Sequence, residues 1–266
     1  MPPVPYNHHV GLFMSDLNLD ASYGVLPWLA VEARFAYRLV DISPTYTEID
    51  GTPKAVPHDI HHHDRTITGI GDPWLALRLG ARRGDLVTSS RLGVSVPLGE
   101  TRPDPFALGA QGLWHEHTQL GTGIFMPIVS LSASYRFQPW ELGGTLFGIF
   151  GLYENEHGWR PSSRMVVASR LSLETLDGRL FPFVMLDLGH QTEEAWHGER
   201  GLEGSTIRTE LLLGGGLRWL FADPWALELA VRGRVAVLSE ESGFDYPGTV
   251  DLSLSTRFDL ATPESE

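Results

Sequence analysis

The chain has 266 residues, is 42% hydrophobic and 20% charged, and carries a net charge of −13 at pH 7. This length fits one large domain or two small ones, and the acidic balance argues against non-specific nucleic-acid binding, which needs a basic surface. Cysteine is absent, which excludes disulfides and thiolate metal sites. The sequence has no apolar run of about 18 residues that would form a transmembrane helix, and its N-terminal stretch MPPVPYNHHV lacks the basic and apolar regions of a signal peptide.

Alternation of apolar and polar residues is the main structural signal along the chain. In the first such segment, Leu17 and Leu19 stand on either side of Asn18. A period of two sends successive side chains to opposite faces of a sheet, so the pattern predicts β-strands. In chain order we predict eleven strands, at residues 10–25, 29–46, 66–82, 85–98, 119–137, 140–153, 162–176, 179–190, 206–221, 225–238 and 248–258.

The connections between these strands alternate between short and long. Short ones lie near residues 26–28, 82–85, 138–140, 176–179 and 221–224, and long polar ones lie near 46–65, 99–118, 154–161, 191–205 and 239–247. Tight turns at one end and longer loops at the other are typical of a transmembrane β-barrel. We therefore predict an all-β fold, an antiparallel up-and-down barrel with short periplasmic turns and longer extracellular loops. It forms one domain over residues 1–266, with the barrel at 10–258 and a polar C-terminal tail at 259–266.

A soluble β-sandwich or lipocalin-like barrel is the alternative fold. Three features favour the membrane barrel over it. The predicted strands are longer than the roughly 5–6 residues that are usual in globular proteins, and one of their faces carries more charge than a soluble core tolerates. Tryptophans also gather at the short turns, as they do in the aromatic girdle of a membrane barrel. These tryptophans are Trp28, Trp140, Trp219 and Trp225.

The strand count raises a problem of parity. Bacterial barrels normally have an even number of strands, whereas the first and last of the eleven predicted strands both end at the short-turn side and would meet in parallel. We therefore expect about twelve strands in the full protein. The simplest source of the extra strand is a longer precursor, or a start that has been trimmed.

The two faces of the predicted strands have different roles. The charged face should line a narrow lumen, because the bore of a barrel grows with strand number and arginines pair with carboxylates inside it. The expected lumen-lining residues are Glu32, Arg34, Arg38, Arg78, Arg91, Arg136, Arg170, Arg208, Arg218, Glu228, Arg232 and Arg234. Among them, we expect Arg34, Arg38, Arg232 and Arg234 to pair with acids such as Glu32 and Glu228. The apolar face should contact lipid at Leu17, Leu19, Val31, Phe35, Leu77, Leu131, Leu213, Leu229, Leu252 and Leu254.

All eleven histidines fall on the side of the long loops, and the stretch HDIHHHD at residues 58–64 is their densest group. Imidazole and carboxylate ligands suit zinc, copper or nickel. The metal hypothesis takes as ligands His58, His61, His62, His63, His115 and His117. We favour the alternative, a polar loop tip at the extracellular mouth with weak, adventitious affinity for a divalent metal.

Three stretches resemble a known family. GIGDPWLALRLG (69–80), RLGVSVPLGE (91–100) and HTQLGTGIFMPIVSLSASYRF (117–137) resemble strands of a broad family of bacterial outer-membrane β-barrels described as putative transporters and grouped with the MetA-pathway of phenol degradation. The resemblance spans roughly residues 10–258, and it implies an outer-membrane barrel with a transport role. VDLSLSTRF (250–258) resembles an outer-membrane assembly signal, although such signals usually end the chain and here a polar tail follows.

Two functions remain in view. The first is a porin-like or transporter-like barrel that passes small solutes across the bacterial outer membrane; the alternative is a non-conducting structural or docking subunit of a cell-envelope complex. Dense pairing of charges with bulky fillers such as Phe181 and Phe183 would favour the alternative. An enzyme is not expected, because Asp187 and His190 match only part of the catalytic group of a barrel protease. We expect no cofactor and no nucleic acid; the expected partners are the lipid bilayer and other envelope proteins.

Overall fold

The computed structural model describes residues 6–55, 64–200, 207–240 and 248–257, and these residues are almost entirely β-structure. No helix among them is long and apolar enough to cross a membrane. The elements are β1 (Tyr6–Leu26), β2 (Leu29–Glu48), β3 (Arg65–Ile70), β4 (Trp74–Arg83), β5 (Leu86–Ser95), α1 (Pro105–Ala110), β6 (Met126–Phe137), β7 (Trp140–Ile149), β8 (Trp159–Arg160), β9 (Arg164–Leu173), β10 (Leu180–Gln191), β11 (Ala195–Trp196), β12 (Arg208–Ala222), β13 (Trp225–Glu240) and β14 (Gly248–Ser255).

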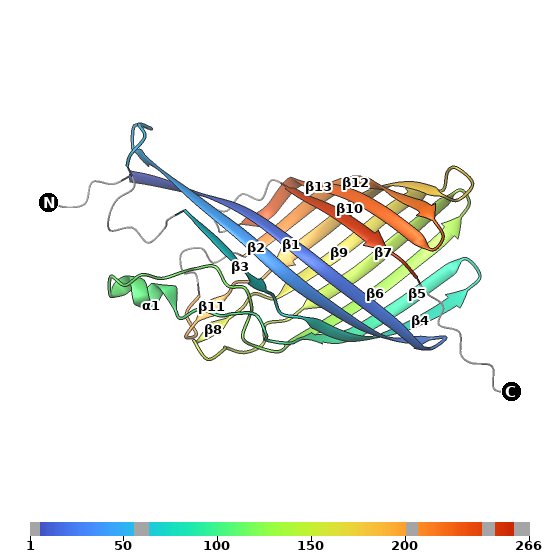
Figure 1. Cartoon of the computed structure of the whole chain (residues 1–266), viewed down its shortest axis with the longest axis horizontal. Helices are drawn as coiled ribbons and strands as arrows, with labels where there is room; N and C mark the ends of the chain where they lie inside the picture. Colours follow the sequence, from blue (N-terminus) through green and yellow to red (C-terminus); the bar gives the residue numbers. More distant parts are fainter. Residues whose placement is uncertain (1–5, 56–63, 201–206, 241–247, 258–266) are drawn as a thin grey trace.

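One large antiparallel sheet holds nearly all of these strands and curls around an interior (Figure 1). Its strands follow one another in the order β1-β2-β4-β5-β6-β7-β9-β10-β12-β13-β14. Strand β3 pairs with residues 37–42 of β2. Each strand therefore pairs with its neighbour along this path, as in an up-and-down barrel. The short β8 and β11 form a separate two-stranded sheet within the long connections. The predicted all-β antiparallel fold is confirmed.

The predicted alternation holds along the strands. In β2, Val31 and Phe35 are exposed on the outer, convex face, and Glu32 between them is largely covered on the inner, concave face. The same holds at the other outward positions that we expected to contact lipid, where Leu17 is 75% exposed and Leu252 is 71% exposed. An apolar face that is open to the surroundings on this scale requires a cover such as lipid.

Several predicted strand boundaries are wrong, and turn chemistry explains the two largest differences. The predicted strand 66–82 divides into β3 and β4 at Gly71–Asp72–Pro73, because proline lacks the N–H that a sheet ladder requires. The predicted strand 119–137 begins only at Met126, because Gly123 adopts a positive φ of 70° in a turn before it. Helix α1 was not predicted, although Asp104 caps its first N–H groups and Pro105 opens it.

The edges of the sheet are β1 and β14, and within the described ranges no pairing joins them. An antiparallel path of eleven strands places its two edges in the same direction, so β1 and β14 could not pair with each other in antiparallel fashion. Every residue of β14 is exposed. The expected twelfth strand stays a prediction.

Candidate functional site

The concave face of the sheet collects its ionisable side chains. Three ion pairs join strands that are not neighbours: Arg91 of β5 with Glu32 of β2, Arg170 of β9 with Glu228 of β13, and Arg232 of β13 with Asp187 of β10. At least one strand lies between the partners of each pair. Such side chains meet only over the inside of the curve, where they converge. This geometry identifies the inner face independently of the sequence pattern.

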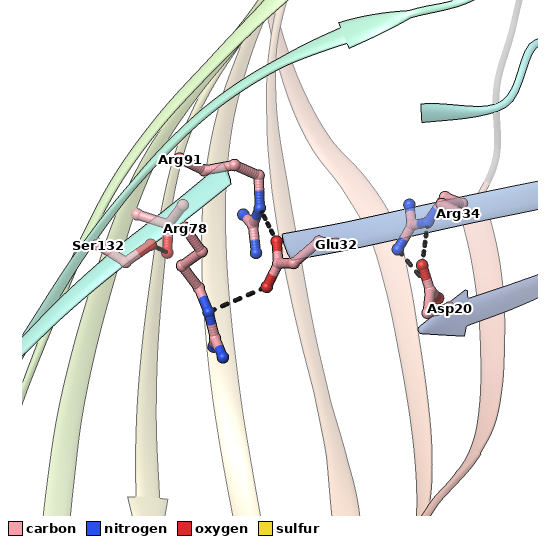
Figure 2. Close-up of polar contacts among 7 residues, drawn as sticks. Asp20, Glu32, Arg34, Arg78, Arg91 and Ser132 are labelled. Atoms are coloured by element: carbon pink, nitrogen blue, oxygen red, sulfur yellow. Dashed lines mark hydrogen bonds and ion pairs between the residues drawn. The ribbon is translucent and has the colours of Figure 1, made fainter. Parts of the chain in front are cut away.

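Glu32 is the centre of a three-residue cluster on β2, β4 and β5. Its two carboxylate oxygens lie 3.0 Å from Nε of Arg78 and 2.5 Å from Nε of Arg91 (Figure 2). Arg78 and Arg91 stand directly opposite each other in the β4–β5 register. Two like charges in that position repel, so the carboxylate of Glu32 offsets the repulsion. Only 17% of the Glu32 side chain is exposed.

Two more pairs join β1 to β2. Nε of Arg34 lies 2.5 Å from Oδ1 of Asp20, as Figure 2 also shows, and Nε of Arg38 lies 2.8 Å from Oδ1 of Asp16. The register sets Asp20 opposite Arg34 and Asp16 opposite Arg38. Arg34 and Arg38 therefore pair with acids of the inner face as expected, although their partners are the directly opposite acids of β1 and not Glu32.

On the far side of the interior, the guanidinium of Arg170 contacts three side chains. Its Nη1 and Nη2 donate to the two carboxylate oxygens of Glu228 at 3.0 and 3.1 Å. Its Nε donates to Ser172 at 3.1 Å, and its guanidinium carbon lies 3.5 Å from the ring centroid of Phe183. Glu228, one of the acids expected to pair with the inward arginines, thus binds Arg170.

The remaining expected lumen residues have other surroundings. Arg232 binds both Asp187 and Asp251. The other four are spread along the inner face: Arg136 lies 3.4 Å from Glu141, the buried Arg208 lies 3.2 Å from Glu210, Arg218 faces Glu228 in the register, and Arg234 faces Leu212.

Small and hydroxyl-bearing side chains cover the middle of the inner face of β5, β6 and β7. Ser89, Ser132 and Thr145 stand opposite one another in successive strands. The hydroxyls of Ser132 and Thr145 lie 3.0 Å apart. A cavity of about 360 Å³ lies here, bounded at one end by Arg170 and by the ion-paired side chains of β10 and β13.

The hydroxyl wall, which we define as Ser89, Ser132, Ser134 and Thr145 together with Gly143 between them, is not among the site residues predicted from the sequence. A signal for it was present. In β6, Ser130, Ser132 and Ser134 alternate with Val129, Leu131 and Ala133. Serine at three successive inward positions indicates that this part of the face is polar but uncharged.

The loop end is held by Asp72, which follows β3. Its carboxylate accepts hydrogen bonds from the backbone N–H of Gly99 at 2.8 Å and of Thr122 at 2.7 Å, and from the Thr122 hydroxyl at 2.6 Å. A side chain on Gly121 would lie 2.4 Å from the Gly99 carbonyl oxygen. The glycines and the aspartate that carried the family resemblance therefore anchor the 96–125 connection to the sheet.

The loop histidines form no metal site in the part of the chain that the structure describes, where no group of three or more potential ligands occurs. His58, His61, His62 and His63 lie outside the described residues. His115 is buried with Nδ1 3.0 Å from the Leu113 carbonyl oxygen, and its ring meets that of His117 edge-on at 5.1 Å. Metal binding by the histidine-rich loop stays a prediction.

Aromatic side chains join two of the long loops. Trp159 and Trp196 stack at 5.9 Å between ring centroids, and the Trp159 indole N–H donates to the carboxylate of Glu194 at 2.9 Å. Burial raises the pKa of the Glu194 carboxyl above its ordinary value, against the opposing effect of the two indole hydrogen bonds.

Asp187 and His190 do not form a catalytic pair. They are three residues apart in β10, so they lie on opposite faces of the sheet. Asp187 is buried against Arg232, whereas Nδ1 of His190 lies 2.9 Å from the Thr209 hydroxyl.

Comparisons with known proteins bear on the fold. The sequence matches no protein-family model, and no curated protein matches it. An outer membrane channel from Pseudomonas putida F1 is similar in structure, with a TM-score of 0.59 at 12% identity over 92% of this chain and 82% of that one. OmpT, an outer membrane protein of Vibrio cholerae, aligns with TM-scores of 0.42 as the trimer and 0.43, each at 10% identity. These alignments cover 94% and 93% of this chain and 98% and 95% of the OmpT chains. The chain has the fold of an outer-membrane β-barrel, as the family resemblance implied.

Proposed function

We propose that this protein is a channel of the bacterial outer membrane that passes small solutes through the interior of the barrel. The observation that carries the proposal is the division of the inner face. The ion-paired arginines and acids neutralise one another against the walls, while the hydroxyl wall borders a cavity of about 360 Å³. A wall of small neutral polar groups leaves room and hydrogen-bonding capacity for a passing solute.

The outer surface supports the membrane setting. Outward residues of the strands are apolar and exposed, and Trp28, Trp140 and Trp219 are exposed beside the short turns. Aromatic side chains at that level match the interfacial girdle of a membrane barrel. The P. putida channel has the same fold, which supports the same setting for this chain.

A structural subunit of an envelope complex is the second candidate. The ion pair of Arg170 with Glu228 and its cation–π contact with Phe183 favour this candidate, because packed and paired side chains stiffen a barrel without leaving a passage for solutes. Arg170 borders the cavity, but Ser89, Ser132, Ser134 and Thr145 still line it. The geometry therefore supports the channel better than the structural subunit.

Conductance in a planar lipid bilayer tests the proposal. The full-length protein, purified and shown to be folded by its heat-modifiable mobility on gels, should give steady single-channel steps in potassium chloride. A folded and inserted barrel that stays silent would reject the channel and leave the structural subunit. A preparation refolded without lipid or detergent serves as the negative control.

A further inference from the structure

The cavity at the hydroxyl wall has the size of a binding site. Its volume of about 360 Å³ lies within the range of small-molecule pockets, roughly 300–1,000 Å³. Three strands supply its floor, because the register sets Ser89, Ser132 and Thr145 side by side. Neighbouring strands lie about 4.8 Å apart, a spacing that a ring bearing several hydroxyl groups can span.

The arginines around this cavity are already paired with carboxylates. Arg170 places both terminal nitrogens on Glu228 and its plane on Phe183. Arg232 donates to Asp187 and to Asp251. A charged solute would have to displace these internal partners, and separating a paired charge in a partly desolvated site is costly.

The hydroxyls, by contrast, keep bonding capacity. A serine or threonine hydroxyl has one donor and two acceptor positions, and the bond between Ser132 and Thr145 uses one donor and one acceptor. Aliphatic lining from Val87, Ala168 and Met185 lies beside them. Hydroxyls next to aliphatic groups match a solute whose hydroxyls and C–H groups alternate.

From this arrangement we infer that the cavity is a binding site for small neutral polyhydroxylated solutes of monosaccharide size, with Ser132 and Thr145 as the principal contacts. This inference rests on the proposed channel and names the class of solute that it favours. Charged solutes of equal size pass less readily, because carboxylates already balance the charges of Arg170 and Arg232.

Single-channel recording with glucose as the probe tests the inference, with gluconate as the charged probe of equal size. Glucose should reduce the ion current in a saturable way, and gluconate should not. In the double variant Ser132→Ala/Thr145→Val the apparent affinity for glucose should fall about fivefold or more, because two hydrogen bonds are lost. The block by glucose is expressed as a fraction of each variant's own potassium chloride conductance, so a change in conductance does not enter the affinity.

The control is the double variant Ser90→Ala/Thr88→Val, which removes a serine and a threonine from the outward face of β5, where they stand level with Leu79 and Ala81. Glucose should block the current through this control variant as strongly as it blocks the unchanged protein. Equal block by glucose and gluconate, or unchanged glucose affinity in Ser132→Ala/Thr145→Val, overturns the inference while the channel stands. Absence of any conductance in the unchanged protein overturns the channel itself.

Discussion

The two faces of the same strands obey different physical rules. On the convex face, leucines such as Leu229 are exposed and have only their outward neighbours, here Leu252, beside them. On the concave face, Glu32 lies between two arginines that belong to other strands. The comparison teaches that the outward residues need only be apolar, because lipid has no specific partner to offer. The inward residues need particular neighbours, so their identities depend on register.

A charge placed on the convex face should have the largest effect. Leu229→Arg should lower the free energy of unfolding in lipid vesicles by about 2–4 kcal/mol, because its mid-strand position puts the guanidinium near the bilayer midplane. Urea titration followed by tryptophan fluorescence measures this difference. Leu86→Arg, outward but next to a short turn, is the matched control and should cost about 0–1 kcal/mol. Equal costs at the two positions would contradict the membrane placement.

Removal of a charge from the concave face should have a smaller effect. Glu32→Gln leaves Arg78 and Arg91 facing each other without their carboxylate, and should cost about 1–3 kcal/mol. The part-exposed arginines keep this below the value for a fully buried pair. The same urea titration applies. Glu141→Gln, from an exposed pair with Arg136, should cost under about 1 kcal/mol. A larger loss at Glu141 than at Glu32 would show that the cluster has been misjudged.

A carboxyl outside both faces should show the smallest effect, as a dependence on pH. Burial raises the pKa of Glu194 above its ordinary 4.5, so folding favours the protonated acid. The burial of the Glu194 carboxyl should therefore be most favourable below pH 4.5, should become less favourable as pH rises through the raised pKa, and should then stay constant. The Trp159 indole N–H signal in NMR spectra follows this change.

Glu194→Gln supplies the comparison for that titration. The amide cannot ionise and still offers an oxygen to the indole, so its Trp159 signal should be independent of pH over the same range. Glu156→Gln, at a solvent-exposed glutamate in the neighbouring loop, should titrate like the unchanged protein. An unchanged titration in Glu194→Gln would assign the effect to another group.

The sequence was sufficient to predict which side chains point inward and which point outward. It was not sufficient to predict which inward side chains pair with each other. A period of two decides whether Arg34 points in or out, but not whether Asp20 or Glu32 stands beside it. The identity of the partner depends on the register between β1 and β2, which places Asp20 opposite Arg34. The turn at residues 26–28 locates the hairpin, but the sequence pattern does not fix which residues stand opposite each other along it.

The loop end was harder to predict, because its contacts join residues far apart in the chain. Asp72 and Thr122 are 50 positions apart, and no local pattern pairs a carboxylate with a distant turn. The glycines of the resembling stretches were visible as structural residues. Their reason, the contact between Gly99 and Gly121 that excludes any side chain, required the folded backbone.

Single-cysteine labelling tests most directly whether the concave face is a water-filled path. The chain has no cysteine of its own, so Thr145→Cys and Leu146→Cys each carry one thiol on neighbouring positions of β7 that face opposite sides. A charged methanethiosulfonate reagent, added during planar-bilayer recording, should lower the single-channel conductance in steps for Thr145→Cys and leave Leu146→Cys unchanged. Block at Leu146→Cys, or unaltered conductance in a Thr145→Cys channel shown by mass spectrometry to be modified, would contradict a conducting path along this wall.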